Sequence, residues 1–136
     1  RPLVAQLRDR AIYTAEDVTV FDQLCERLPQ LAGPPEPPAR LHGDLWIGNI
    51  HAGADGHPYL IDPVAHGGHR EFDLALLQLF GTPGDRCLAA YDEIHPRAPD
   101  HESRRNLWAI TPILWHAVLL EGNYPAQALS MARQYL

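Results

Sequence analysis

The chain has 136 residues, 46% of them hydrophobic, and a formal net charge of −6. This length and composition fit one globular domain with a real core. Its 17 acidic residues outnumber its 11 basic ones, which form no run, so the basic surface typical of a nucleic-acid-binding protein is missing. Cys25 and Cys87 lie far apart in helix-like patterns, where cysteine usually behaves as a small buried hydrophobe, and we expect no disulfide between them.

The most apolar run extends from Leu107 to Leu120 and is interrupted by Pro112 and His116. A bilayer-spanning helix needs roughly 18 or more apolar residues, so this run predicts a core helix and no membrane contact. No apolar leader opens the chain, which makes the cytoplasm the expected compartment. The only methionine is Met131, and we expect the chain to be part of a longer protein.

The first predicted helix begins after Thr14, which has the sequence of an N-cap with Asp17 three residues further on. Apolar residues then recur at helical spacing, and the helix is expected to end before Pro29. Residues 33–40, GPPEPPAR, contain too many prolines for a helix or a central strand. They predict an extended connector that leads into residues 41–50, LHGDLWIGNI.

A β-hairpin is predicted next, because residues 50–52 and 59–61 flank a turn sequence with an Asp-Gly pair at residues 53–58. Pairing of these two strands would bring Asn49, just before the first strand, close to Asp62, just after the second. Four helices are expected later in the chain, at residues 71–80, 85–94, 103–121 with a kink near its proline, and 126–136. The predicted fold class is therefore α+β, mostly helical with a small hairpin.

Asp44 and Asn49 are separated by four residues, LWIG, which is the spacing of the kinase catalytic loop D-x-x-x-x-N. Asp62 follows one hairpin later, where kinases keep a metal-binding aspartate. Phosphoryl transfer to an alcohol needs a carboxylate that orients the hydroxyl and oxygen ligands that hold Mg²⁺ on the phosphates. Each residue alone is typical of a polar turn, but their order and spacing together predict a phosphotransfer site.

A metal-dependent hydrolase is the alternative enzyme class. Imidazole and carboxylate groups suit zinc, iron and manganese, and the candidate ligands are His42, Asp44, His51, Asp62, His66 and His69. No HExxH or other compact histidine spacing is present, and histidines in a Gly-rich stretch such as AHGGH, residues 65–69, are more often solvated or bonded to backbone. The phosphotransfer interpretation is therefore preferred.

Four segments of the chain resemble the fructosamine (ketosamine) kinase family, in the aminoglycoside-phosphotransferase and choline-kinase branch of protein-kinase-like folds. They are HGDLWIGN, YLIDP, GGHREFDLALLQLFG and RNLWAITPILWHAVLLEGNY. The resemblance covers nearly the whole chain from Thr14 onward. Trp46 and the R-E-x-D-L-A segment from Arg70 to Ala75 are its most specific parts, whereas Ile47 departs from the serine that the family often has there.

The resemblance implies that Asp44 is the catalytic base and that Asn49 and Asp62 are Mg²⁺ ligands. ATP would donate the phosphoryl group to a sugar hydroxyl of a ketosamine, either a small sugar-amine or a glycated protein, in a deglycation reaction.

Three further residues gain expected roles from the resemblance. His42 would orient the loop through backbone hydrogen bonds, and Trp46 would contact the substrate or seal the core. Asp73 would brace the loop backbone from a buried position, or would be an exposed carboxylate favoured by a helix N-terminus.

A kinase site also needs a Gly-rich cover and a lysine on the phosphates, but this chain has no such loop and no lysine. The resemblance therefore implies that residues 1–136 form a C-terminal catalytic lobe without the N-terminal nucleotide lobe, which a further segment or a partner chain would complete. We expect the isolated chain to be inactive or barely active. The second functional hypothesis is a non-catalytic, ligand-binding remnant of such a kinase.

Overall fold

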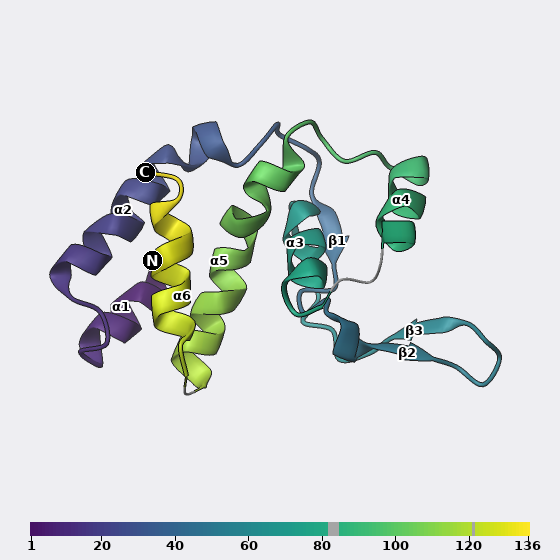
Figure 1. Cartoon of the computed structure of the whole chain (residues 1–136), viewed down its shortest axis with the longest axis horizontal. Coiled ribbons are helices and arrows are strands. Elements are labelled where there is room, and N and C mark those ends of the chain that lie inside the picture. Colours follow the sequence, from purple (N-terminus) through teal and green to yellow (C-terminus); the bar gives the residue numbers. More distant parts are fainter. Residues whose placement is uncertain (82–84, 121) are drawn as a thin grey trace. The chain divides into compact units, whose positions relative to one another are not determined.

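The computed structural model describes residues 1–81, 85–120 and 122–136, with only the backbone of Asp85. Within these ranges the fold is a mostly helical α+β structure, as the sequence predicts, with six α-helices and two small two-stranded sheets (Figure 1) where the sequence predicted five helices and one hairpin. The chain forms two compact units: unit 1 comprises residues 1–33 and 106–136, and unit 2 comprises residues 34–105.

Unit 1 contains α1 (Pro2–Asp9), α2 (Ala15–Leu31), α6 (Tyr124–Arg133) and the larger part of α5 (His101–Leu119). Helix α2 packs against both α1 and α6. The most deeply buried residues come from these helices. Four of them are 0% exposed: Leu7, Ile113, Ala128 and Ala132. Helix α1, which starts with a proline in its first turn, was not predicted from the sequence.

Helix α2 begins with the predicted capping box: the Thr14 side chain accepts a hydrogen bond from the backbone of Asp17, whose carboxylate accepts one from the backbone of Thr14. The predicted end before Pro29 is wrong, because the helix continues to Leu31. A proline removes one backbone donor, and residues 26–30 are exposed, so water can bond the carbonyl that loses its partner.

The remaining helices are confirmed, α4 (Asp85–Ile94) at its predicted bounds and the others with shifted ends. Helix α5 begins two residues before the predicted start, and its predicted end at Glu121 lies outside the described residues; α6 begins at Tyr124. None of the described helices is long and apolar enough to cross a membrane. Both cysteines are free as expected, but Cys25 in α2 is half-buried and Cys87 in α4 is exposed, where both were expected to be buried.

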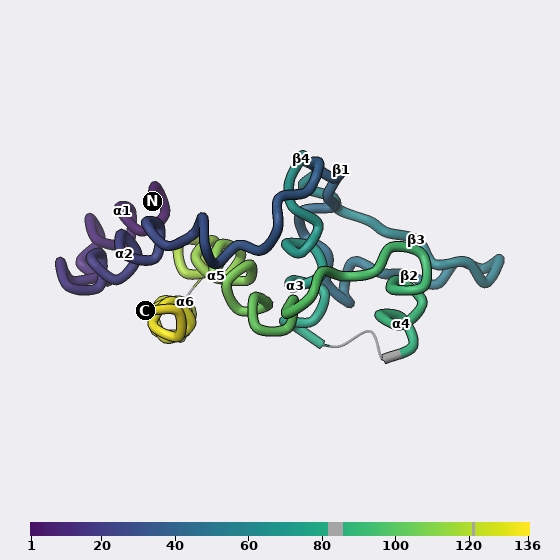
Figure 2. The backbone as a smooth tube through the Cα atoms, turned by 90° about the horizontal axis from the view of Figure 1, so that it is seen from above, coloured from purple at the N-terminus to yellow at the C-terminus, as the bar shows by residue number. Residues whose placement is uncertain are grey.

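Two antiparallel strand pairs lie in unit 2. Strand β1 (Ala39–Leu41) pairs with β4 (His66–Gly68), and Leu41 lies opposite His66 (Figure 2). The loop predicted for residues 65–69 is therefore partly a strand, since its two glycines lie opposite the end of the proline-rich connector. This pairing joins residues that are 25 to 29 positions apart along the chain, which local sequence patterns do not reveal.

The predicted hairpin is confirmed as β2 (Ile50–Ala52) and β3 (Pro58–Leu60), with His51 opposite Tyr59. Its turn contains Gly56 at φ +79°, a conformation that glycine adopts without steric cost. Strand β3 ends one residue earlier than predicted.

Helix α3 (Glu71–Leu79) is buried over its first seven residues and not along a single stripe. It provides most of the core of unit 2, together with Leu41, Leu88 and Ala98. A helix buried on all sides must pair any charge that it carries, and this constraint determines the candidate site.

Candidate functional site

The predicted phosphotransfer loop follows β1 and contains a short 3₁₀ turn, Ile47–Asn49. The Asn49 Nδ2 group donates hydrogen bonds to the backbone oxygen and to Oδ2 of Asp44, both at 2.9 Å. Because both partners are acceptors, the amide must direct its nitrogen toward Asp44. Asn49 is buried at 7% exposure, so this contact fixes one carboxylate oxygen of Asp44 in place.

His42 connects the start of the loop to the segment after the hairpin. Its Nδ1 accepts a hydrogen bond from the Asp44 backbone N–H at 3.3 Å, and its Nε2 lies 2.9 Å from the Ile61 carbonyl oxygen. A carbonyl only accepts, so the ring proton is on Nε2, and Nδ1 is left as the acceptor. His42 thus orients the backbone of Asp44 through hydrogen bonds.

Asp62 lies immediately after this contact, exposed and at φ +53°. Aspartate is one of the few residues that adopt this left-handed conformation readily. The Ile61 N–H donates to the Asn49 carbonyl oxygen at 3.1 Å, which extends the hairpin ladder by one bond. Asn49 therefore lies opposite Ile61, and Asp62 is the next residue along the chain.

Asp73, in the first turn of α3, accepts hydrogen bonds from the backbone at the start of the loop. Its Oδ2 accepts from the His42 N–H at 2.7 Å and its Oδ1 from the Gly43 N–H at 3.0 Å. The residue is only 9% exposed, so it is a buried brace and not an exposed helix carboxylate. Gly43 adopts φ +83°, and a Cβ there would overlap the Val64 carbonyl oxygen, so both the conformation and the space require glycine.

Trp46 lies at the surface of the loop and not in the core. Its indole covers Gly48 closely enough that a Cβ there would overlap the ring, and it meets Phe80 edge-on at a centroid distance of 6.3 Å. It nevertheless remains 36% exposed. One part of the ring therefore stabilises the 3₁₀ turn, and another part is accessible to a ligand.

Two side chains carry oxygen atoms of the kind that a hard cation prefers. One is Asn49 on this loop, whose Oδ1 accepts no hydrogen bond from the described residues, and the other is the Asp62 carboxylate after the hairpin. Mg²⁺ is usually bound by one or two protein groups together with phosphates and water, so this pair fits it. Among the described residues, no three His, Cys, Asp or Glu side chains gather to hold a metal. The candidate hydrolase histidines contact backbone carbonyls instead: His42, His51, His66 and His69.

Buried ion pairs around α3 were not predicted from the sequence. Glu71 accepts from Arg104 through both oxygens, at 2.7 and 2.9 Å, and Arg70 donates to both oxygens of Glu36. The hydrogen bonds from Arg70 lower the pKa of Glu36, and those to Glu71 raise the pKa of Arg104. The sequence did contain an indication of buried ion pairs, because three charged residues fall among the apolar residues of HREFDLALL, residues 69–77.

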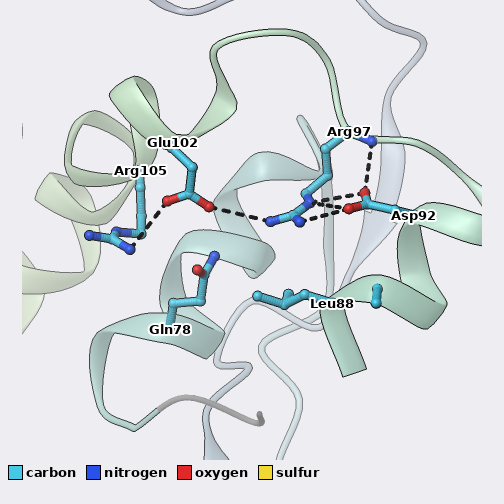
Figure 3. Close-up of a pocket in the computed structure, with 7 residues that line it drawn as sticks. Gln78, Leu88, Asp92, Arg97, Glu102 and Arg105 are labelled. Atoms are coloured by element: carbon cyan, nitrogen blue, oxygen red, sulfur yellow. Dashed lines mark hydrogen bonds and ion pairs between the residues drawn. The ribbon is translucent and has the colours of Figure 1, made fainter. Parts of the chain in front are cut away.

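A separate pocket of about 480 Å³ lies in unit 2 (Figure 3). It is lined by Gln78, Leu88, Ala89, Asp92, Arg97, Glu102 and Arg105. The charged groups pair with one another: Asp92 accepts from Arg97 at 2.7 Å, and Glu102 lies 3.5 Å from Arg97 and 3.3 Å from Arg105. Hydrogen bonds from Arg97 lower the pKa of Asp92 to about 2.

The sequence profile of the fructosamine kinase family matches residues 3–136. Among curated proteins, a chloroplastic protein-ribulosamine 3-kinase of Oryza sativa subsp. indica is 34% identical over 124 residues, which is 88% of this chain and 36% of the relative. A probable ketoamine kinase of Synechocystis sp. is 38% identical over 111 residues, which is 81% of this chain and 38% of the relative.

Solved structures show the same likeness. A candidate fructosamine-3-kinase from Thermobifida fusca superposes with a TM-score of 0.91 at 43% identity, over 98% of this chain and 46% of that protein. One from Haemophilus somnus, at 22% identity and a TM-score of 0.80, shares the fold. The chain thus spans less than half the length of these relatives.

Proposed function

The chain belongs to the fructosamine kinase family, and from this premise we propose that it is the catalytic lobe of an ATP-dependent kinase that phosphorylates a sugar hydroxyl of a ketosamine. The observation that carries the proposal is the 2.9 Å bond from Asn49 Nδ2 to Asp44 Oδ2. It joins the predicted base to a predicted metal ligand, and Asp62 follows Ile61, the residue that bonds the Asn49 carbonyl.

In the proposed mechanism, Asp44 orients the sugar hydroxyl and accepts its proton. Asn49 donates to Oδ2 of Asp44. The other carboxylate oxygen of Asp44, Oδ1, accepts no hydrogen bond from the described part of the chain and is available to the sugar hydroxyl. Asp73 and His42 keep the Asp44 backbone in place, so little reorganisation is needed when the substrate binds.

Asn49 and Asp62 would hold Mg²⁺, which when bound neutralises charge on the phosphates. Gly43 allows the loop to turn closely enough for both loop amides to reach Asp73. These assignments agree with the D-x-x-x-x-N spacing of kinases and with the braced geometry of the loop.

The substrate class follows from the relatives, whose names specify ribulosamine and ketoamine substrates. The accessible part of the Trp46 indole suits the apolar face of a sugar ring, and it lies two residues from the proposed base. The amine could be small or part of a glycated protein, since phosphorylation would occur on the sugar in both cases.

The nucleotide site needs more than this chain. A kinase lysine on the phosphates has no counterpart here, because the sequence contains no lysine. The chain also covers only 36% to 46% of the relatives named above. We therefore propose that a further lobe supplies the remaining phosphate contacts and that the isolated chain transfers little or no phosphate.

The proposal can be tested by joining this chain to the part of the Thermobifida fusca protein that it does not match. The joined protein is incubated with MgATP and a fructosyl-amine and followed by phosphorus NMR. A new sugar-phosphate resonance is expected, and the same amine without its sugar should give none. If the joined protein binds MgATP but forms no sugar phosphate, the chain is a non-catalytic remnant.

A further inference from the structure

We propose that Arg70 is a positioning residue for the phosphotransfer loop, an assignment that rests on the proposed function of that loop. Arg70 precedes α3 and lies three residues before Asp73, the brace. Its side chain is only 10% exposed. A buried guanidinium is stable only when its charge and its N–H groups are satisfied, so the partners of Arg70 show what it holds together.

One group of partners lies on the connector before β1. Arg70 Nε and Nη2 donate to the two carboxylate oxygens of Glu36 at 2.8 and 3.0 Å. Glu36 precedes β1 by three residues, and Asp73 binds the two residues that follow β1. Strand β1 is therefore tied at both ends to the beginning of α3, which sets where the loop starts.

The other group of partners lies at the end of α4. Arg70 Nη1 donates to the His95 carbonyl at 2.8 Å and to the Tyr91 hydroxyl at 3.3 Å, and Nη2 donates to the Pro96 carbonyl at 2.7 Å. The guanidinium also lies 5.8 Å from the centre of the Tyr91 ring, within range of a cation–π interaction.

These contacts use every donor that the side chain has. A guanidinium carries five N–H groups, and Arg70 makes five hydrogen bonds, to Glu36 twice, Tyr91, His95 and Pro96. A lysine offers three donors without the planar fork. The connector, α3 and the end of α4 are therefore joined by the side chain of Arg70. No other residue type could make all of these hydrogen bonds.

Arg97 is a matched comparison, because its side chain is 11% exposed and it too is paired with a carboxylate. Its carboxylate partners, Asp92 and Glu102, lie five residues away on either side. It thus stabilises a local turn. Loss of Arg97 should lower stability without moving the loop, whereas loss of Arg70 should release the loop itself.

The test is amide hydrogen exchange by NMR on the 136-residue chain, comparing Arg70→Met with Arg97→Met. The His42 and Gly43 amides donate hydrogen bonds to Asp73. The readout is their exchange rate divided by that of the Leu76 amide in α3. In Arg70→Met this ratio should rise about tenfold or more, the range expected when a hydrogen-bonded charge is lost. It should stay unchanged in Arg97→Met and rise less in Arg70→Lys.

Glu36→Gln provides a second variant, because it retains the carbonyl contacts of Arg70 and should raise the ratio in the same direction by a smaller factor. If Arg70→Met does not fold, Glu36→Gln decides. The proposal is overturned if the ratio in the folded variants equals that of Arg97→Met. The experiment uses no nucleotide and measures no turnover. A failure of this proposal can therefore be distinguished from a failure of the proposed kinase reaction.

Discussion

Gly43 provides one of the two backbone amides that Asp73 binds, and no other residue could take its place without moving the loop. Its φ of +83° alone would disfavour a side chain, and the Val64 carbonyl fills the space where a Cβ would stand. The imidazole of His66 is also close, at 2.9 Å from that position. The position of Asp44 therefore depends on a residue that performs no chemistry.

We predict that Gly43→Ala lowers the free energy of unfolding by about 2 kcal/mol or more, because it combines a left-handed φ with a backbone overlap. Urea unfolding measures this change. Gly56→Ala is the matched control: its φ is +79°, but no atom lies within 4 Å of the added Cβ. Equal losses in the two variants would show that the overlap relaxes and that Gly43 is needed only for its φ.

The residues proposed to do chemistry could be chosen from the sequence, but their supporting contacts could not. The four-residue spacing between Asp44 and Asn49 is local and matches a known loop pattern. Arg70 and Glu71, by contrast, find their partners 34 and 33 residues away. No periodicity links charges over such distances, although a charge within an apolar run indicates that a partner must exist.

At the level of elements, α3 is the structure on which the site is built. It is buried on all sides at its start. Three charged residues at or just before this start bind different partners: Arg70 binds the connector, Glu71 binds α5 and Asp73 binds the loop. The pair between Glu71 and Arg104 is buried at both ends, at 5% and 8% exposure. Removing one partner would leave the other charge buried and unmatched.

We predict that Glu71→Gln destabilises the chain by about 3 kcal/mol, the usual cost of breaking one side of a buried ion pair. Chemical denaturation measures the loss. The double variant Glu71→Gln, Arg104→Met should recover part of it, because no unpaired charge is left. Asp9→Asn, in an exposed pair with Arg8, is the surface control and should change stability by less than about 0.5 kcal/mol. A loss as small as this in Glu71→Gln would contradict the account.

Elements with strong local signals were predicted well. The capping box at Thr14, the Asp-Gly turn of the hairpin and the glycine after α3 each determine their own element. The pairing of β1 with β4 was missed because it joins two short strands that are distant in the sequence. The end of α2 was misplaced because Pro29 falls in an exposed last turn, where its effect is weak.

The whole molecule consists of two compact units, and the candidate site uses only residues of unit 2. That unit also contains the carboxylates with the strongest arginine pairs, which connect its stability to pH. The pKa of Asp92 is lowered from 3.8 to about 2 by hydrogen bonds from Arg97. A carboxylate with a lowered pKa in the folded state stabilises it above the unfolded pKa and loses this effect as the pH falls through the folded pKa.

We predict that Asp92→Asn destabilises the chain at pH 7 and that the difference from wild type narrows between about pH 4 and pH 2. Denaturant unfolding at several pH values measures the difference. In an Arg97→Met background the same substitution should show a weaker pH dependence, because the only hydrogen bond to Asp92 that is left comes from the backbone N–H of residue 97. A difference that stays constant down to pH 2 would show that Arg97 does not set the charge state of Asp92.

The most direct test of the central claim is the rate of phosphoryl transfer to a fructosyl-amine by the joined protein with Asp44→Asn. The account predicts a rate about 10² to 10⁴ times lower, the usual contribution of a positioned base, with MgATP binding retained. Asp55→Asn, at the exposed turn of the hairpin, is the matched control and should leave the rate unchanged. Transfer by Asp44→Asn within about threefold of wild type would contradict the assignment of Asp44 as the base.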